Sequence, residues 1–218
     1  MNLMDLSKKS RIVVAIHKDL DGLASLAIFL RYLKENKVIR NFDANRVEVH
    51  YLDEYQAIHT KKSYDLSMDL PITSKSSRYI VDHHIETFKM LNYEGVIDNE
   101  NWFVVNIKKS PPKILANVLC LNDSISMELS KIHYKGDIIF PRKLSIVEHV
   151  SQFFAQNNQT NMFKYLALKM AKLGLDIEKD EIIQKTYHKL KEDICLFFCF
   201  IAQINNKINI TTFHIPNS

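Results

Sequence analysis

Acidic residues and histidines gather at three places in the first half of the chain, and each place directly follows a stretch that is a candidate strand. HKDLDG follows RIVVAI, MDLP follows YDLS, and VDHH follows RYI. Aspartate and histidine together suit manganese, iron or zinc better than calcium. Carboxylates in one crevice repel each other unless cations neutralise them, and these ligands suffice for two ions about 3.5–4 Å apart. The candidate site residues are His17, Asp19, Asp21, Asp69, Asp82, His83 and His84.

Strands must bring these residues together. Apolar and β-branched runs predict strands at 11–16, 46–52, 64–70, 78–84 and 101–107. Residues 22–35 carry apolar side chains at helical spacing. Alternating strands and helices favour an α/β fold with a parallel sheet sandwiched by helices. Because the carboxyl ends of parallel strands share one edge, we expect the candidate ligands to meet there.

The second half of the chain has a different pattern, which is mostly helical from Pro111 onward. Helices are predicted at 111–122, 141–154, 161–175 and 179–204, and a last strand at 206–216. The polar stretch AQNNQTN at 155–161 is the best linker candidate. We therefore predict an α/β metal-binding core over 1–155 and a helical extension over 162–218 that ends in a short strand.

Composition sets bounds on function. The chain has 218 residues, 46% of them hydrophobic, and no apolar run long enough to cross a membrane. It shows no signal-peptide pattern, and its three cysteines lack zinc-site spacing. We therefore expect a cytoplasmic protein with reduced thiols. A net charge of +4 permits an anionic partner such as nucleic acid but does not require one. Only four glycines leave little material for a glycine-rich loop.

Each motif alone also has an ordinary structural explanation. The DLDG stretch is compatible with a turn before a helix, with Asp21 as the N-cap. It also shares residues with the haloacid dehalogenase motif, but Leu23 stands where that motif has Thr or Ser. A lone histidine pair is common on surfaces, and an aspartate before a proline, such as Asp69, is also compatible with the simple end of a strand. The ordered combination of the three motifs favours the metal centre.

In this combination the sequence resembles the DHH phosphoesterases over residues 10–155. That family includes RecJ-type single-strand nucleases, oligonucleotide and cyclic-dinucleotide phosphodiesterases, and family II pyrophosphatases. The resemblance implies that His17 and Asp19 bind one metal ion. It also implies that Asp21 and His83 bind a second ion, with Asp69 bridging the two.

The resemblance assigns catalytic roles as well. It implies that Asp82 orients a histidine from behind and that His84 contacts the scissile phosphate. The reaction would be hydrolysis of a phosphate ester with two Mn²⁺ ions, or Mg²⁺ in their place.

Two departures from the family pattern matter. Where the family has a fourth acidic motif, this chain has LSIVEHVSQF, so Glu148 or His149 would replace the expected aspartate, and Asp137 is a weaker substitute. Alternatively, Glu148 and His149 are ordinary helix residues and the site has decayed. The chain also lacks the glycine-rich loop of a second, substrate-binding domain, since only Gly174 lies beyond residue 136.

The expected function is metal-dependent hydrolysis of phosphodiester bonds in single-stranded nucleic acid or short oligonucleotides. The alternative is a non-catalytic RecJ-like replication-fork scaffold that binds GINS or the helicase together with single-stranded DNA. A third option is a small-molecule phosphatase or pyrophosphatase. Tyr51, Tyr55, Lys61 and Lys62 are either contacts for a single strand or ordinary loop residues. A protein partner, from a replication or repair complex or as a homodimer, is compatible with the missing domain, and no membrane association is expected.

Overall fold

The computed structural model describes residues 3–40, 44–97, 99, 102–132, 145–157 and 159–192. The chain forms five strands in this part, which are β1 (Ile12–His17), β2 (Val47–Leu52), β3 (Tyr64–Met68), β4 (Ser77–Asp82) and β5 (Phe103–Val105). These match the five predicted strands to within two residues at each end. All adjacent pairs are parallel, which confirms the predicted α/β class with a parallel sheet.

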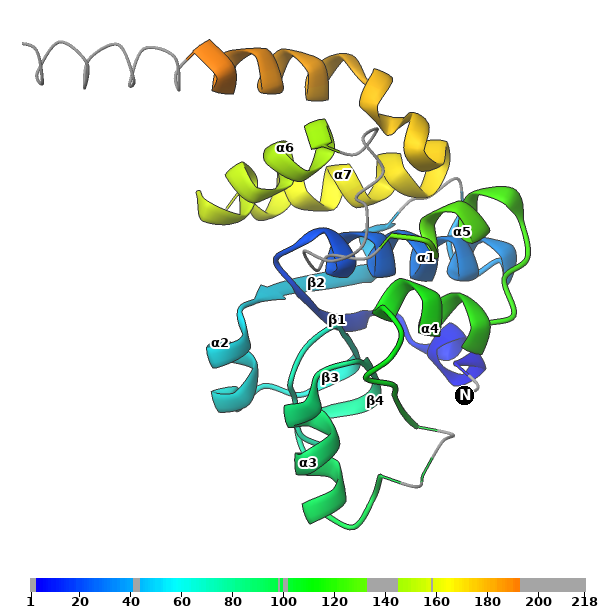
Figure 1. Cartoon of the computed structure of the whole chain (residues 1–218). Coiled ribbons are helices and arrows are strands. Elements are labelled where there is room, and N and C mark those ends of the chain that lie inside the picture. Colours follow the sequence, from blue (N-terminus) through cyan, green and yellow to red (C-terminus); the bar gives the residue numbers. More distant parts are fainter. Residues whose placement is uncertain are drawn as a thin grey trace, which may run out of the picture. The chain divides into compact units, whose positions relative to one another are not determined.

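Seven α-helices lie among the described residues before Gly174 (Figure 1). They are α1 (Leu20–Glu35), α2 (Glu54–His59), α3 (Ile85–Tyr93), α4 (Pro111–Val118), α5 (Ser124–Leu129), α6 (Ser145–Gln156) and α7 (Thr160–Leu173). Short 3₁₀ helices are η1 (Met4–Lys8), η2 (Ala44–Arg46) and η4 (Gly174–Lys179). The sequence patterns do not predict α2, α3 or α5, which have six to nine residues each and are too short for a clear helical period.

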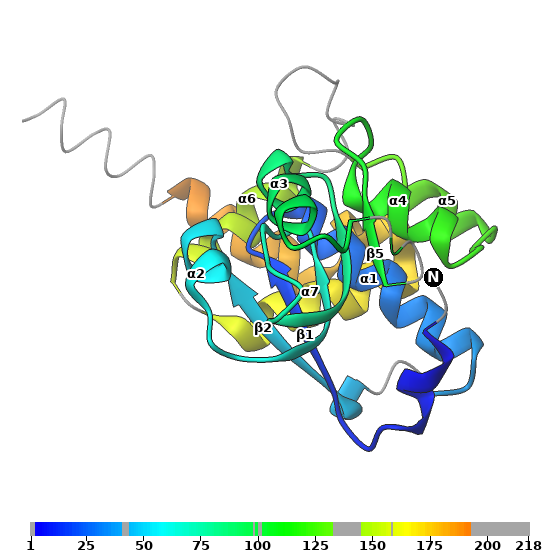
Figure 2. The ribbon, with the colours of Figure 1, turned by 90° about the horizontal axis from the view of Figure 1, so that it is seen from below.

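The strand order in the sheet is β2-β1-β3-β4-β5. Figure 2, seen from below, shows β2 beside β1. From β1 the chain moves to one side to form β2, then returns to the other side of β1 to form β3. The connections that leave β1 and β3 therefore diverge, and a crevice opens at their carboxyl ends.

Helices cover both faces of the sheet. On one face Ala15, Ile80 and Phe103 of the strands pack with Ala57 of α2 and Leu91 of α3. Because side chains alternate along a strand, the fully buried Val14 and Ile16 point to the opposite face. There α1 contacts β1 and β3 and also packs against α4, α5 and α7. Figure 1 shows α1 and α7 on one side of the strands and α3 on the other.

The chain divides into two compact units, residues 1–178 and 179–218. Helix α7 belongs to the first unit, where it packs on α1 and α6. In the second unit a helix is described over 181–192. The predicted strand at 206–216 and the two cysteines Cys195 and Cys199 lie outside the described residues.

None of the helices described here combines the length and apolar character needed to span a lipid bilayer.

A buried arginine ties α1 to two later helices. Arg31 of α1 donates from Nε to Ser126 Oγ (3.0 Å), from one Nη to the Ala171 carbonyl (2.7 Å) and from the other to Asp123 Oδ1 (2.5 Å). Its side chain is only 12% exposed. Asp123 also caps the start of α5 by accepting from Ser126 N. The network therefore joins α1, α5 and α7 on the face of the sheet that α1 covers.

We expect Arg31→Met to lower the free energy of unfolding by about 2–3 kcal/mol, because three donors are lost and buried acceptors are left without partners. Urea denaturation measures this. Arg11→Met is the matched control, since the Arg11 side chain is 65% exposed in its ion pair with Glu48 and such pairs contribute about 0–1 kcal/mol. Equal losses in the two variants would contradict a structural role for the Arg31 network.

Candidate metal centre

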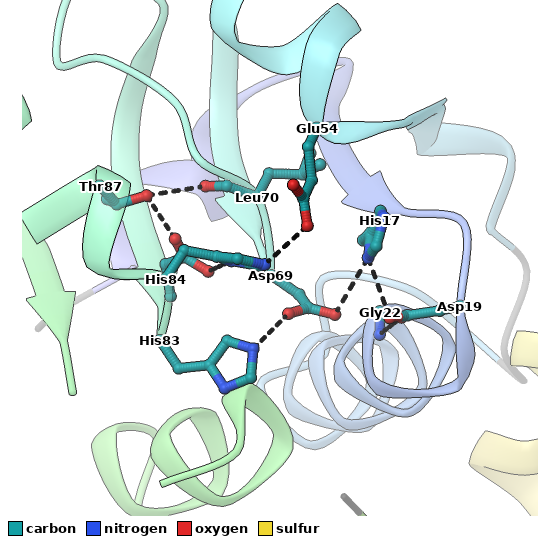
Figure 3. Close-up of polar contacts among 10 residues, drawn as sticks. His17, Asp19, Gly22, Glu54, Asp69, Leu70, His83, His84 and Thr87 are labelled. Atoms are coloured by element: carbon teal, nitrogen blue, oxygen red, sulfur yellow. Dashed lines mark hydrogen bonds and ion pairs between the residues drawn. The ribbon is translucent and has the colours of Figure 1, made fainter. Parts of the chain in front are cut away.

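Histidines and carboxylates from three adjacent strands meet at the crevice between β1 and β3 (Figure 3). His17 is the last residue of β1, and Asp19 follows it before α1 begins. Asp69 directly follows β3, and Asp82 ends β4 with His83 and His84 behind it. The shared edge of parallel strands thus places together residues that are up to 67 positions apart in the chain.

The β1–α1 turn holds Asp19 from two sides. Asp19 is the N-cap of α1, and its Oδ1 accepts from Gly22 N at 2.9 Å. Its Oδ2 lies 2.9 Å from His17 Nδ1. The expectation that Asp21 caps the helix is therefore wrong, because α1 begins two residues earlier, at Leu20. Asp21 instead lies in the first turn and is 1% exposed.

Asp69 is buried at the centre of the cluster, with 1% exposure. Its Oδ1 lies 3.3 Å from His83 Nε2, and its Oδ2 lies 3.9 Å from His17 Nδ1. Among the described residues this Oδ2 has no hydrogen-bond partner. The backbone is held in the left-handed region (φ 60°), and its N–H donates to the Val81 carbonyl. A non-glycine residue in this conformation indicates a position fixed by its surroundings.

Asp69 belongs to two groups of potential metal ligands. One group is His17, Asp19 and Asp69, and the other is Asp69, His83 and His84; within each, the ligand atoms lie within 4.8 Å of one another. A carboxylate shared by two ligand groups is the arrangement that a bridging residue between two ions requires. Asp21 is in neither group, although its charge acts on Asp69.

Asp82 orients the imidazole ring of His84. Its Nδ1 lies 2.8 Å from Asp82 Oδ1, while the other carboxylate oxygen of Asp82 accepts from Thr87 Oγ1. The His84 Nε2 lies 3.5 Å from Glu54 Oε1. A carboxylate on one ring nitrogen fixes the tautomer and leaves the other nitrogen available for the crevice. The resemblance to the DHH phosphoesterases implies this orienting role for Asp82 but does not identify which histidine receives it.

Glu54 and Thr87 are site residues that sequence reasoning missed. Glu54 opens α2, and Thr87 is a fully buried residue of α3. The sequence does carry a signal for the position of Glu54. The stretch DEYQ after β2 has the pattern of a capping box, which Asp53 and Gln56 form at the start of α2. Recognising it places a helix start, and so Glu54, at the carboxyl edge of the sheet.

The charges in the cluster are not balanced by protein groups alone. Burial, followed by the charges of Asp19, Asp21 and Asp82, holds the pKa of Asp69 well above its usual value. Burial acts to raise the pKa of Asp19, but its hydrogen bond and charge interaction with His17 outweigh this and lower it. Burial opposes protonation of His17, yet the same bond to Asp19 raises the pKa of this histidine. One His–Asp pair is thus compensated, while the carboxylate of Asp69 is not.

The donor set fits a divalent cation. Asp69 Oδ2 is a buried acceptor with no hydrogen-bond donor among the described residues, and such an atom costs free energy unless it is paired. Carboxylate oxygens mixed with imidazole nitrogens suit Mn²⁺, Fe²⁺ or Zn²⁺. Metal binding would displace the proton that His17 and Asp19 share, so it should release protons.

The fourth motif lies on α6. Glu148 is half-buried and its Oε1 accepts from Gln152 Nε2 at 3.3 Å, while His149 is exposed. Burial raises the pKa of Glu148, and the neighbouring His149 acts in the opposite direction. In the part of the chain that is described, neither residue belongs to a ligand group. Asp137 lies outside the described residues.

In comparisons of the sequence with known protein families and with curated proteins, nothing matches. Among solved structures, the fold is similar to the crystal structure of an uncharacterized protein from Helicobacter pylori G27, with a TM-score of 0.48 and 12% sequence identity. The match covers 84% of this chain and 62% of the Helicobacter pylori chain. The present chain therefore spans less than two thirds of the length of that protein.

Proposed function

We propose that the chain is a metal-dependent phosphoesterase of the DHH group that hydrolyses phosphodiester bonds in single-stranded nucleic acid or short oligonucleotides. The observation that carries this proposal is Asp69, a buried carboxylate at the topological switch point that is shared by two His/Asp ligand groups. Ionisation of Asp69 is unfavourable beside the other carboxylates unless a cation balances it, and paired cations next to an open crevice would suit phosphoryl chemistry.

The ligand assignment follows the two groups. His17 and Asp19 would hold one ion, His83 would hold the second with Asp21 nearby, and Asp69 would lie between them. Two Mn²⁺ ions are the proposed cofactors, with Mg²⁺ as the alternative. When bound, such ions supply Lewis acidity and lower the pKa of water to near neutrality.

The protein's own groups then act on the substrate. His84 would donate from Nε2 to a non-bridging phosphate oxygen, because Asp82 holds its Nδ1. The Asp82 carboxylate would stabilise positive charge on that ring. Glu54, 3.5 Å from His84 Nε2, would give up this contact when a phosphate enters the crevice, since the two anions compete for one donor.

The test uses the purified full chain with and without Mn²⁺ on a substrate panel of single-stranded DNA, single-stranded RNA, a dinucleotide, pyrophosphate and a model phosphodiester. We expect Mn²⁺-dependent hydrolysis of the oligonucleotides or the dinucleotide, and its loss with a chelator. Cleavage of pyrophosphate alone would favour the small-molecule phosphatase. No hydrolysis of any substrate by Mn²⁺-saturated protein would refute the enzyme.

A second candidate function is the non-catalytic RecJ-like scaffold that binds GINS or the helicase and single-stranded DNA. One observation favours it, namely that Glu148 and His149 are in neither described ligand group. A missing fourth ligand would weaken the second ion, and a binding protein does not need that ion.

The fourth motif yields a prediction of its own. We expect Glu148→Ala and His149→Ala to bind Mn²⁺ within about twofold of wild type, because first-row ions bind only ligands that reach them, at about 2 Å. Isothermal titration calorimetry measures the affinity, and His83→Ala is the variant expected to lose it. A decrease of about tenfold or more in either α6 variant, the scale of even an outer-shell loss, would show a fourth ligand and strengthen the enzyme over the scaffold.

A further inference from the structure

A cavity of about 190 Å³ lies at the same edge of the sheet as the metal centre. Its walls come from the β1–α1 turn, the end of β2, α2 and the α6–α7 turn. Three aromatic side chains, Tyr51, Phe154 and Phe163, and four polar ones, Lys18, Gln56, Gln159 and Thr160, are among those that line it. Lys164 of α7 donates to the Val47 carbonyl at 2.7 Å, which anchors the α7 wall to β2.

The cavity and the metal centre share two structural elements. Lys18 lines the cavity and stands between His17 and Asp19 in the chain. The register of the sheet pairs Leu52, another lining residue, with His17. Helix α2 contributes Gln56 to the cavity and Glu54 to the contact with His84. The β1–α1 turn and helix α2 therefore each contribute to both the cavity and the metal centre.

The residues that line the cavity are suited to a ligand with an uncharged or anionic ring system. None of the described residues that line the cavity carries a carboxylate, so they offer no counterion to a cationic group. The Tyr51 and Phe163 rings meet edge to face, with centroids 4.8 Å apart, and such aromatic walls favour a flat partner. The amide side chains offer both donors and acceptors, which suits the polar edge of a nucleobase.

Tyr51 supplies an unsatisfied polar atom. The residue is 9% exposed, and its hydroxyl is buried without a hydrogen-bond partner among the described residues. An unpaired buried hydroxyl costs free energy that a ligand atom can recover. Burial raises the pKa of Tyr51, so the hydroxyl keeps its proton and can donate.

We propose that this cavity is the base-binding subsite of the phosphoesterase and takes a nucleobase whose phosphate lies at Asp69. The inference rests on the proposed function and adds to it the place where a base would bind, which would favour nucleotides over pyrophosphate and sugar phosphates. The volume of the cavity agrees with a single base as its ligand, because clefts that enclose a whole drug-sized ligand are larger, at about 300–1,000 Å³. At about 190 Å³ the cavity accommodates one ring system, and the sugar and phosphate remain in the crevice.

The experiment compares adenosine 5′-monophosphate, uridine 5′-monophosphate and ribose 5-phosphate, titrated by calorimetry into the Mn²⁺-loaded full chain. We expect the nucleotides to bind at least tenfold more tightly than ribose 5-phosphate. Ala155→Phe, which fills the cavity from its α6 wall, should remove that advantage and leave ribose 5-phosphate affinity unchanged. Tyr51→Phe should weaken the nucleotides about 3- to 10-fold, the range of one hydrogen bond.

Tyr93→Phe is the matched control, because Tyr93 is 94% exposed at the end of α3, and it should bind like wild type. Adenosine binding to Asp69→Asn separates the two proposals, since a base subsite should hold adenosine even if the metal centre fails. Equal affinity of wild type for nucleotide and ribose 5-phosphate would overturn the subsite and leave Mn²⁺-dependent hydrolysis standing. Unaltered nucleotide affinity in folded Ala155→Phe and Tyr51→Phe proteins would overturn it equally.

Discussion

The Asp69→Asn variant should lose Mn²⁺ binding and hydrolysis together, and in metal-free buffer it should be more stable than wild type. Both results follow from one carboxylate that is 1% exposed and faces the charges of Asp19, Asp21 and Asp82. The amide keeps the shape of the side chain and removes its charge. Asparagine also tolerates the left-handed backbone at this position (φ 60°).

The pH dependence follows from the raised pKa of Asp69. In the unfolded chain Asp69 ionises near its ordinary value, but in the fold it keeps its proton to higher pH. Its protonated form therefore favours the fold fully below the unfolded pKa, and this contribution is lost as pH rises through the folded pKa. Metal-free wild type should thus lose stability relative to Asp69→Asn as the pH is raised from about 4 toward neutrality.

Thermal unfolding with and without Mn²⁺ measures these effects. Without metal we expect Asp69→Asn to melt about 2–4 °C higher at neutral pH, which corresponds to about 1 kcal/mol in a chain of this size. Wild type should gain stability on adding Mn²⁺ and the variant should gain none, because ligand binding to the fold raises the melting temperature only where affinity exists. Hydrolysis should fall to the level without metal.

Asp65→Asn, on the strand β3 that leads to Asp69, is the matched control. The Asp65 carboxylate accepts from Val13 N at 2.9 Å and pairs with Lys9, so its charge is compensated. This variant should be less stable than wild type and should still bind Mn²⁺. If Asp69→Asn is destabilised as Asp65→Asn is, or keeps the Mn²⁺ response, Asp69 is an ordinary buried aspartate and the bridging assignment is wrong.

The ends of the strands, and their position at one edge of the sheet, could be predicted from the sequence because they depend on short-range patterns. A buried parallel strand reads as an apolar run. The runs in β1 and β4 are clear and the one in β3 is weaker, and each leads directly into aspartate or histidine residues. Parallel strands place those ends at one edge of the sheet, and the strand order then makes β1, β3 and β4 neighbours. This reasoning reached His17, Asp19, Asp69, His83 and His84, the members of both ligand groups.

Other features depend on three-dimensional contacts that no local pattern encodes. The choice of Asp19 over Asp21 as N-cap depends on one turn of backbone and on the bond to His17. Thr87 reaches Asp82 only because α3 folds back over the end of β4. The cavity beside Lys18 combines the β1–α1 turn with the α6–α7 turn, elements about 140 residues apart. Sequence reasoning named Tyr51 as a possible contact but had no means to place it against Phe163.

Gly22 is the position where helix propensity and the structure predict opposite results. It lies in the first turn of α1, and inside a helix alanine is favoured over glycine by about 1 kcal/mol. On propensity alone, Gly22→Ala should stabilise the protein. In the fold, a Cβ on Gly22 would lie 2.3 Å from the carbonyl oxygen of His17 and 3.0 Å from its carbonyl carbon. These are backbone atoms, so no side-chain rotation relieves the overlap.

We therefore expect Gly22→Ala to destabilise the fold by about 2–3 kcal/mol, at the upper part of the usual range for overpacking. The effect on the metal centre should be larger than on the fold. The start of α1 must move away from β1, which displaces His17 and breaks the 2.9 Å bond from Gly22 N to Asp19. Mn²⁺ affinity should fall at least tenfold although every ligand side chain is still present, because a ligand that misses its position by a fraction of an ångström no longer binds.

Gly95→Ala separates this steric effect from the general cost of replacing a glycine. Gly95 has a φ of 70°, and a Cβ there would meet nothing within 4 Å, so alanine pays only the left-handed backbone cost of about 1–2 kcal/mol. It should keep wild-type Mn²⁺ affinity. Chemical denaturation and calorimetry on both variants decide the matter. A Gly22→Ala protein that is more stable than wild type and binds Mn²⁺ normally would mean that α1 does not sit tightly against β1, and the ligand geometry derived from that contact would be wrong.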